Sequence, residues 1–422
     1  MNILVIGSGG REHSIIKAIK QNPAVDIVYV LPGNGGIAAD AQCFPIGAED
    51  AAGIAEFASS HPIDFAVVAP DGALVAGIAD VLRGLSIPCF GPSKAAAIIE
   101  GSKVFSKDFM KKYDIPTAGY EIFSNPESAL YYLENSAYPI VIKADGLALG
   151  KGVIIAEDKA QAVAAVQSVM EDKKFGKSGS RIVVEEFLSG PEVSVLCFTD
   201  GITVKPMVSS MDHKRAFDGD RGLNTGGMGV IAPNPYYTNE IANLCMETIF
   251  LPTIRGMGRE GRRFSGCLYF GLMLTDRGPK VIEYNCRFGD PETQAVLPLL
   301  RSDLLTIMQA CENGTLAQTE VEFSGQSSAC VILASMGYPE SYPTGFEIEI
   351  GDVGDSVIYH AGTKRQDGKL VTSGGRVLAV TAVSDTLEDA LDQVYASVDD
   401  ISFTGMFYRK DIGQKALKKS EE

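Results

Sequence analysis

The sequence predicts a multidomain protein that combines α/β and α+β architecture in three parts. Three observations lead to this fold class. Residues 1–102 alternate apolar runs with amphipathic helical stretches, residues 103–325 mix strands and helices around glycine-rich turns, and residues 326–422 contain mainly short β-rich runs. A chain of 422 residues with 45% hydrophobic content can form several cores of ordinary domain size.

The N-terminal part shows the alternation that is typical of βαβ units. Such units place parallel strands in a sheet that is buried on both faces, so each strand is a continuous apolar run. The expected strands are Ile3–Ile6, Ile27–Leu31, Phe65–Ala69 and Pro88–Phe90, and the expected helices are Glu12–Lys20 and Leu74–Leu82.

The middle part begins with a helix predicted at Gly101–Lys112, which Pro116 prevents from continuing. Residues 117–192 then read as an inserted α+β module, and a long polar stretch, Asp212–Gly229, suggests a functional loop. The expected elements are strands at Ile140–Ala144, Val153–Ala156 and Arg181–Phe187, helices at Lys159–Glu171 and Asn239–Arg255, and a hairpin at Cys267–Tyr284. The C-terminal part is expected to hold strands at Ala329–Ala334, Val357–Ala361 and Arg376–Val383 and a helix at Leu387–Val398.

The net charge and the spacing of the cysteines argue against several classes of function. The formal net charge of -16 disfavours binding to nucleic acid or anionic membranes, which attract basic surfaces. The N-terminus runs directly into a strand, and no apolar run approaches a membrane-spanning length, so we expect a cytoplasmic protein. The eight cysteines are widely spaced without a C-x-x-C pair, which predicts reduced thiols and no zinc site.

The first glycine loop, Gly7–Glu12, joins a strand to a helix and could hold a phosphate on its backbone N–H groups. It does not match a dinucleotide fingerprint, because Glu12 stands at the third glycine position and the second strand ends in Leu31-Pro32-Gly33 without an acid. A tight turn that binds nothing remains the alternative.

A second glycine loop lies within Lys143–Gly152. It is not a Walker loop, because Gly152 replaces the Ser or Thr that would hold magnesium, and a strand follows instead of a helix. We interpret it as a mobile hairpin tip that folds over a triphosphate, with an exposed turn as the alternative.

Two acidic runs complete the pattern, Val183–Glu192 and Val281–Glu292. In a strand, Glu283 and Asn285 point to the same face, where their oxygens suit a hard cation such as Mg²⁺. Arg287 follows Asn285 by two residues, so its side chain should point to the same face of the strand.

Together these runs resemble the ATP-grasp superfamily, and more closely the phosphoribosylamine–glycine ligase family. The resemblance covers essentially the whole chain. The segments that carry it are Gly7–His13, Gly91–Lys94, Lys143–Val153, Asp212–Asp220, Asn224–Gly229 and Asn285–Gln294. It implies a pre-ATP-grasp N-terminal domain, an ATP-grasp fold of two α+β subdomains with residues 117–192 as the lid, and a small β-rich C-terminal domain.

The resemblance implies a reaction of purine biosynthesis that joins glycine to 5-phosphoribosylamine through a glycyl phosphate. The reaction uses ATP and Mg²⁺, with Mn²⁺ as the alternative metal ion. The implied catalytic residues are Arg287, Lys143 and Asp212, and the implied metal ligands are Glu283 and Asn285. The implied ATP-binding residues are Lys103, Lys143, Gly150, Lys151, Gly152, Glu185, Glu186, Phe187, Leu188 and Glu192. The implied substrate-binding residues are Gly9, Gly10, Arg11, Asp71, Lys214, Arg215, Asn224, Thr225, Gly226 and Arg287.

Several questions stay open at this stage. The substrate phosphate could be held by the turn at Gly9–Arg11 or by Lys214, Arg215 and the Asn224–Gly229 loop. Asp212 or His213 could handle a proton, although a structural hydrogen bond suits His213 at least as well. The chain departs from the family in having Asp71 where Glu is frequent, and from other ATP-grasp enzymes in having Gly271 where an acid often stands. Another ATP-grasp ligase and a non-catalytic nucleotide-binding regulator are the alternatives, and a monomer is slightly favoured.

Overall fold

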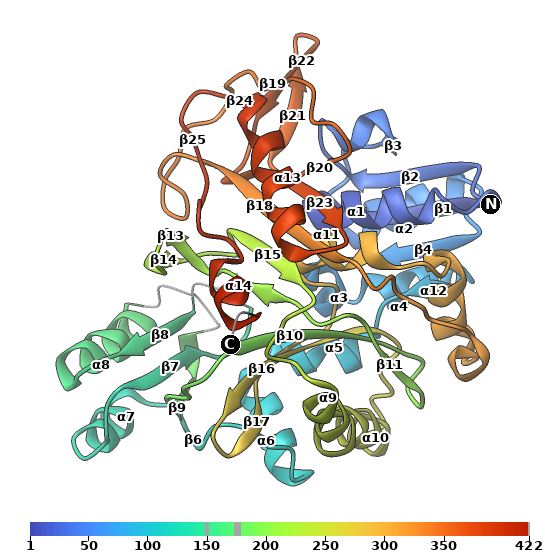
Figure 1. Cartoon of the computed structure of the whole chain (residues 1–422). Coiled ribbons are helices and arrows are strands. Elements are labelled where there is room, and N and C mark those ends of the chain that lie inside the picture. Colours follow the sequence, from blue (N-terminus) through green and yellow to red (C-terminus); the bar gives the residue numbers. More distant parts are fainter. Residues whose placement is uncertain (148–151, 173–178, 421–422) are drawn as a thin grey trace.

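The computed structural model describes residues 1–147, 152–172 and 179–420 (Figure 1). A parallel sheet lies at the N-terminal end of the chain, two antiparallel sheets occupy the middle, and a further antiparallel sheet carries the C-terminal part. The predicted mixture of α/β and α+β architecture is therefore confirmed. Among the described residues, no helix is long and apolar enough to cross a membrane.

The N-terminal sheet has five parallel strands in the order β3-β2-β1-β4-β5. The helix predicted at Leu74–Leu82 is divided, because Gly77 adopts a φ of +97° and ends one helix before the next begins. The strands are β1 (Asn2–Gly7), β2 (Ile27–Pro32), β3 (Gln42–Cys43), β4 (Phe65–Val68) and β5 (Cys89–Phe90), and the helices are α1 (Gly10–Ile19), α2 (Ala51–Ser60), α3 (Asp71–Ala76) and α4 (Ile78–Gly84).

Two short helices connect this sheet to the middle of the chain, α5 (Lys94–Gly101) and α6 (Lys103–Lys112). The Ser102 hydroxyl accepts a hydrogen bond from the Phe105 N–H, so Ser102 caps α6 and the helix begins at Lys103 rather than at Gly101. The helix ends at Lys112, ahead of Pro116, as predicted.

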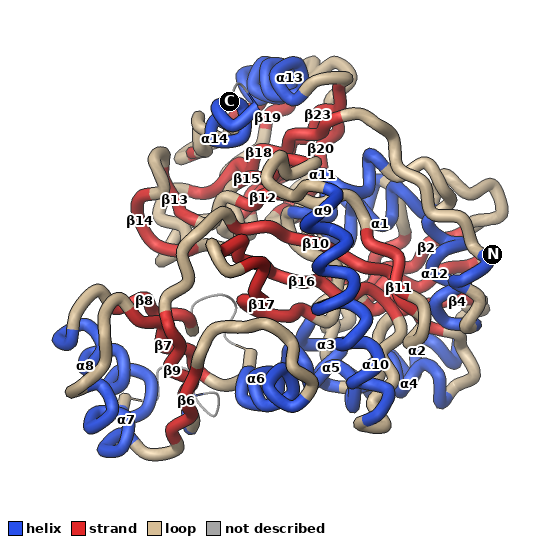
Figure 2. Tube along the Cα trace, turned by 60° about the horizontal axis from the view of Figure 1, so that its bottom comes forward, coloured by secondary structure: helices blue, strands red, loops and turns tan. Residues whose placement is uncertain are grey.

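The sheet within residues 117–192, the segment predicted to be the lid, is called the lid sheet below. It is antiparallel, with the strand order β6-β9-β7-β8. Its two helices lie on the face away from β17, where alternate side chains such as Ile142 and Val184 form a separate apolar core (Figure 2). The other face carries Lys143 and Glu185. The elements are β6 (Tyr120–Phe123), α7 (Pro126–Leu133), β7 (Ile140–Ala144), β8 (Val153–Ala156), α8 (Lys159–Val166), a π-helical turn (Gln167–Glu171) and β9 (Ile182–Glu186).

The central sheet is also antiparallel, in the order β11-β10-β16-β17, and one helical layer covers it (Figure 2). The predicted hairpin forms between β16 and β17, and the predicted helix from Asn239 continues beyond Arg255. The elements are β10 (Glu192–Thr199), β11 (Val204–Pro206), α9 (Asn239–Cys245), a π-helical turn (Met246–Phe250), α10 (Leu251–Arg259), β16 (Gly266–Thr275) and β17 (Gly278–Asn285).

The C-terminal sheet crosses the predicted boundary at residue 326. Its order is β12-β15-β18-β23-β20, and its first two strands lie at the two ends of the polar stretch, ahead of the boundary. The strands of this region are β12 (Met211–Asp212), β13 (Arg215–Phe217), β14 (Arg221–Asn224), β15 (Gly229–Ala232), β18 (Ser327–Ser335), β19 (Glu349–Ile350), β20 (Val357–His360), β21 (Thr363–Gln366), β22 (Lys369–Thr372), β23 (Arg376–Ser384), β24 (Ile401–Ser402) and β25 (Met406–Phe407). The helices are α11 (Glu292–Val296), α12 (Leu304–Asn313), α13 (Leu387–Asp399) and α14 (Gln414–Ser420).

Candidate active site

Lysines from three parts of the chain surround the carboxylate of Glu283. Burial alone would raise the pKa of this carboxyl, but the positive charges of Lys214, Lys143, Lys103 and Arg287 together hold it below its ordinary value. Glu283 is therefore ionised at neutral pH within a strongly positive environment. Such an excess of positive charge suits a polyphosphate.

Lys143 on β7 contacts the central sheet directly. Its Nζ lies 3.0 Å from Glu185 Oε1 and donates a hydrogen bond of 3.0 Å to the carbonyl of Ile282 on β17. Lys107 Nζ, from α6, lies 3.0 Å from Glu185 Oε2. The side chains of Lys107, Glu185 and Lys143 are only 3%, 4% and 5% exposed. Burial lowers the pKa of Lys107 to about 8, and Glu185 opposes that effect.

Lys103 opens α6 and donates a hydrogen bond of 2.8 Å to the carbonyl of Gly146, at the start of the second glycine loop. Burial lowers the pKa of its ammonium group, and Glu283 acts in the opposite direction. On the far side of the loop, the Gly152 carbonyl accepts a hydrogen bond of 2.9 Å from the Ala144 N–H. The predicted ATP-binding residues Gly150 and Lys151 lie outside the described residues.

The two predicted metal ligands lie on one face of β17. Glu283 pairs with Gly271 and Asn285 pairs with Tyr269 across the antiparallel ladder, so their side chains point the same way. Within the described residues, no group of three or more His, Cys, Asp or Glu could hold a metal ion. Mg²⁺ often takes one or two protein oxygens and completes its shell with phosphates and water, so this pair fits that ion.

Arg287 follows β17 and is held by a glutamate from the N-terminal part. Its Nη2 lies 3.0 Å from Glu100 Oε1 and 3.3 Å from Asn285 Oδ1. Glu100 also accepts a hydrogen bond of 2.7 Å from the Cys286 N–H. Among the described residues, Arg287 Nε is buried without a hydrogen-bond partner, which leaves one donor for a ligand.

Asp71, the first residue of α3, lies in the electrostatic field of Arg287. Burial would raise the pKa of its carboxyl, but the guanidinium groups of Arg287 and Arg11 bring it below the ordinary value. An arginine and an ionised aspartate are thus near one another, which is the charge arrangement that an amino acid zwitterion requires.

The predicted phosphate turn at the start of α1 is already bonded within the protein. The Gly9 N–H donates a hydrogen bond of 2.5 Å to Glu12 Oε2, and Arg11 Nε lies 2.6 Å from Glu12 Oε1. Gly10 packs against α11, because a Cβ there would lie 2.6 Å from the side-chain nitrogen of Gln294.

Asp212 and Lys214 belong to a second charged group beside β10. Lys214 Nζ lies 2.8 Å from Glu192, one of the predicted ATP-binding residues. Burial and the neighbouring Glu292 raise the pKa of Asp212 well above its ordinary value. Within the described part of the chain, Asp212 Oδ1 is buried without a hydrogen-bond partner.

The polar stretch folds back on itself in a hairpin. Arg215 pairs with Asn224 across β13 and β14, and its Nη1 donates a hydrogen bond of 2.8 Å to the Gly222 carbonyl. The backbone and hydroxyl of Thr225 donate to the Lys214 carbonyl at 2.7 and 2.9 Å. Four of the predicted substrate ligands, Lys214, Arg215, Asn224 and Thr225, therefore lie together.

His213 has a structural position. The Gly413 N–H donates to His213 Nε2 at 3.1 Å, so the ring proton resides on Nδ1, which contacts the Gly229 carbonyl at 3.2 Å. Burial and the charge of Arg409 lower the pKa of His213 to about 4. The ring is therefore neutral and fully bonded at pH 7, which favours the structural interpretation over proton transfer.

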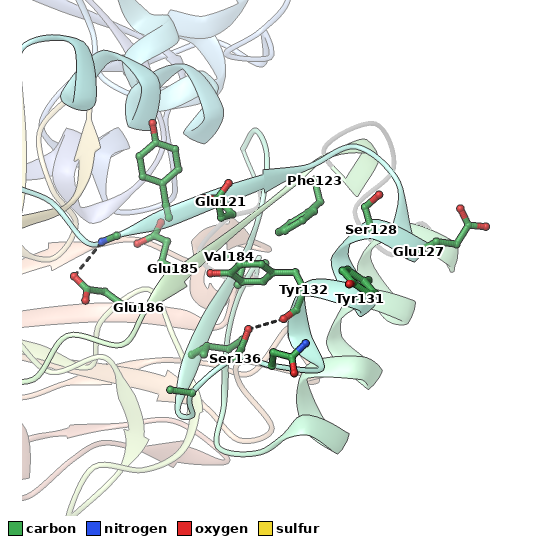
Figure 3. Close-up of a pocket in the computed structure, with 15 residues that line it drawn as sticks. Glu121, Phe123, Glu127, Ser128, Tyr131, Tyr132, Ser136, Val184, Glu185 and Glu186 are labelled. Atoms are coloured by element: carbon green, nitrogen blue, oxygen red, sulfur yellow. Dashed lines mark hydrogen bonds between the residues drawn. The ribbon is translucent and has the colours of Figure 1, made fainter.

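The predicted ATP-binding residues Glu185 to Leu188 lie where the chain leaves the lid sheet at the end of β9. Glu186 Oε1 accepts hydrogen bonds from Lys280 Nζ at 2.7 Å and from the Gly119 N–H at 3.0 Å, the second of which is drawn in Figure 3. Phe187 is 41% exposed, and Leu188 is half-buried. A groove of about 970 Å³ begins beside Glu185 and Glu186 and extends along the outer face of the lid toward Tyr131 and Tyr132 (Figure 3).

Sequence reasoning missed Lys107, Glu100, Tyr338 and Arg376. Lys107 stands four residues after Lys103 on the same face of α6, so helical spacing could have revealed it. The other three reach the site from distant elements, and no local pattern marks them.

Comparison with known families matches three consecutive parts of the chain. Residues 1–100 match the phosphoribosylglycinamide synthetase N domain, residues 101–293 its ATP-grasp (A) domain, and residues 328–415 its C domain. A curated phosphoribosylamine–glycine ligase from Clostridium acetobutylicum is 47% identical, with 98% of this chain and all of the relative covered.

The chain belongs to the phosphoribosylamine–glycine ligase family. The resemblance stated from sequence is thereby confirmed, and the chain is an ATP-grasp ligase by family. A solved phosphoribosylamine–glycine ligase from Thermotoga maritima has a TM-score of 0.86 and 35% identity, covering 97% of this chain and 100% of that chain. A biotin carboxylase domain from Hydrogenobacter thermophilus has a TM-score of 0.74 at 16% identity, covering 96% of this chain and 91% of that chain; it shares the fold.

Proposed function

We propose that this chain ligates glycine to 5-phosphoribosylamine with ATP, giving glycinamide ribonucleotide, ADP and phosphate in de novo purine biosynthesis. Membership of the family supports this reaction. One structural observation supports the assignment of the reaction to particular residues: the ionised Glu283 is surrounded by the charges of Lys103, Lys143, Lys214 and Arg287. A carboxylate that must react with ATP requires such charge neutralisation more than it requires a covalent nucleophile.

The reaction proceeds in two steps. A glycine carboxylate oxygen attacks the γ-phosphorus of ATP, the bond to the β,γ-bridging oxygen breaks, and ADP leaves. The amine of phosphoribosylamine then attacks the acyl carbon of glycyl phosphate, loses a proton and displaces phosphate. Both steps depend mainly on positioning and on stabilising negative charge.

Within this proposal, Lys103 and Lys143 bind ATP phosphates, and Gly150, Lys151 and Gly152 are further ATP-binding residues. The segment from Glu185 to Leu188 contacts adenine through its backbone. Glu192 binds the ribose and exchanges its present partner Lys214 for the nucleotide. Glu283 and Asn285 would hold Mg²⁺, or Mn²⁺, which accepts the same oxygen ligands, and the bound ion would neutralise phosphate charge.

The substrate residues divide between two subsites. Arg287 binds the glycine carboxylate through its free Nε, and Asp71 binds the ammonium group. The phosphoribosylamine is held by the Lys214, Arg215 and Asn224–Gly226 group, with the Gly9–Arg11 turn as the other candidate. Asp212, whose raised pKa favours the protonated form, orients an amine or carbonyl by hydrogen bonding.

We also infer a cytoplasmic monomer with domains at 1–102, 103–325 and 326–422. All eight cysteines are free thiols, which agrees with a reducing compartment. Light scattering that gave twice the monomer mass of 44.9 kDa would contradict the monomer.

An ADP-release assay with single omissions tests the function. Sustained ADP release over many turnovers should require glycine, phosphoribosylamine, ATP and Mg²⁺ together, and mass spectrometry should detect glycinamide ribonucleotide. ADP release with another amine in place of phosphoribosylamine would indicate a different ATP-grasp ligase. Nucleotide binding without turnover under every combination would indicate a regulator.

A further inference from the structure

The two candidate phosphate-binding segments converge on Asp290. Its Oδ2 lies beside the first glycine turn, since a Cβ at Gly9 would be 3.2 Å from it, and its Oδ1 accepts a hydrogen bond of 2.9 Å from Gln294 Nε2. Its Oδ1 also lies 3.2 Å from Nη2 of Arg376, which belongs to β23 of the C-terminal sheet. Asp290 therefore joins the N-terminal helix to an arginine from the opposite end of the chain.

Arg376 continues from Asp290 to the glycine-rich loop. Its Nη1 donates to the carbonyl oxygens of Gly226 and Asp290 at 2.8 Å each, and it lies 3.3 Å from the carbonyl of Gly227. A planar guanidinium can contact a carboxylate and several carbonyls at fixed angles, whereas an ammonium group cannot reproduce that geometry.

The loop is shaped to receive this guanidinium. A Cβ at Gly226 would lie 3.0 Å from Arg376 Cζ, so a residue with a side chain would displace the arginine or the loop. The Gly226 N–H donates a hydrogen bond of 3.0 Å to the Tyr338 hydroxyl, also from the C-terminal part. Both polar groups of residue 226 are thus fixed by the same distant region.

These contacts also decide between the two phosphate subsites. The Gly9 N–H is already bonded to the carboxylate of Glu12, and the carboxylate of Asp290 lies beside the same turn, so an incoming phosphate would have to displace negative groups there. At the other subsite, Lys214 is paired with Glu192, and the proposed transfer of Glu192 to the ribose of ATP would free this lysine for the phosphate. We propose that Arg376 is a positioning residue that holds the Thr225–Gly227 loop in the shape that binds the phosphate of phosphoribosylamine, an inference that rests on the proposed function.

The kinetic test compares Arg376→Lys with wild type for each substrate separately. The variant keeps the charge beside Asp290 and loses the fork, so the phosphoribosylamine KM should rise about tenfold to a hundredfold. The KM values of ATP and glycine should stay within about twofold. Arg365→Lys, at an exposed position of β21, is the matched control and should change none of the three.

A second variant keeps the proposal testable if Arg376→Lys folds poorly. Tyr338→Phe removes only the hydroxyl that accepts the Gly226 N–H, and should raise the phosphoribosylamine KM about threefold to tenfold. Because Tyr338 holds the N–H of Gly226 and Arg376 holds its carbonyl, both act on the same residue, and the effects of the two substitutions should not add. Equal rises in all three KM values, or an unchanged phosphoribosylamine KM in the folded variants, would overturn the proposal.

Hydrogen exchange separates this inference from the proposed function. The amides of residues 225–228 should exchange faster in Arg376→Lys than in wild type, while the amides of β7 should not change. Protection of the loop that is unaffected by Arg376→Lys would overturn the positioning role whatever reaction the protein catalyses. A wild-type protein whose ADP release does not require phosphoribosylamine would instead overturn the proposed function, even with the exchange result intact.

Discussion

Lys107 Nζ and Glu185 Oε2 lie 3.0 Å apart in a buried ion pair whose other oxygen faces Lys143. Glu185 thereby connects Lys107 of α6 to Lys143, the lysine that is proposed to bind ATP phosphate. Since Lys107 also donates a hydrogen bond of 2.8 Å to Thr117, where the lid joins the body, the pair links the position of Lys143 to the base of the lid.

Lys107→Met should impair ATP binding although Lys107 is not proposed to touch the nucleotide. Without it, Glu185 would bind Lys143 alone and draw it from the phosphates, so the ATP KM should rise about tenfold. Loss of one partner from a buried pair should also lower the unfolding free energy by about 3 kcal/mol. Lys111→Met, exposed on the same helix, is the control for steady-state kinetics and thermal unfolding. A stable Lys107→Met protein with the wild-type ATP KM would contradict this role.

Glu283→Gln and Asn285→Leu should lower kcat by about a hundredfold or more, because both would weaken the ion that neutralises charge in phosphoryl transfer. Binding of ATP without metal, measured by calorimetry, should change much less. Asp276→Asn, at the exposed turn of the same hairpin, should behave as wild type in both measurements. Wild-type turnover in either site variant would remove that ligand from the proposed metal site.

Arg287→Lys should raise the glycine KM and lower kcat, with a combined loss in kcat/KM of about a hundredfold. A lysine cannot contact Glu100, Asn285 and a substrate carboxylate at the same time, whereas the guanidinium has separate donors for them. The measurement is ADP release at varied glycine and saturating ATP. An unchanged glycine KM and kcat would place the carboxylate elsewhere.

Acid should destabilise the protein below about pH 6.5. His213 has a pKa of about 4 when folded, whereas an unfolded histidine titrates near 6.5, so only the unfolded state binds a proton in the interval between them. The contribution of neutral His213 to the unfolding free energy is complete above about pH 6.5. By pH 5, about 2 kcal/mol of this free energy should be lost. Urea unfolding of wild type and His213→Gln at pH 7 and pH 5 checks this, because the variant should lose less between the two pH values. Identical losses would exclude His213 as the source.

Local patterns predicted much of the fold because they depend on near neighbours. The alternation that places Glu283 and Asn285 on one face needs only the period of a strand, and β17 confirms it. The prediction of one helix at Leu74–Leu82 was wrong in one respect, because the chain forms two helices that are separated at Gly77. A glycine can also continue a helix, and the positive φ of Gly77 depends on packing.

The contacts that build the site could not be predicted in the same way. Glu100 and Arg287, or Arg376 and Gly226, meet only after separate sheets have packed together, and no spacing in the sequence records that encounter. The predicted phosphate turn shows the same limit. A glycine-rich helix start indicates an available anion site, yet Glu12 and Asp290 supply the anions from within the protein.

The pairing of β15 with β18 has a consequence for how the chain folds. Gly229 aligns with Val331, so the strand beside the glycine-rich loop gains this neighbour only after a long intervening segment has been synthesised and closed into place. We therefore expect a chain truncated after residue 325 to form its N-terminal sheet while residues 211–232 remain unprotected in hydrogen exchange. The substrate loop would then be among the last parts to become ordered during synthesis, and a nascent chain would acquire catalytic competence only near its completion.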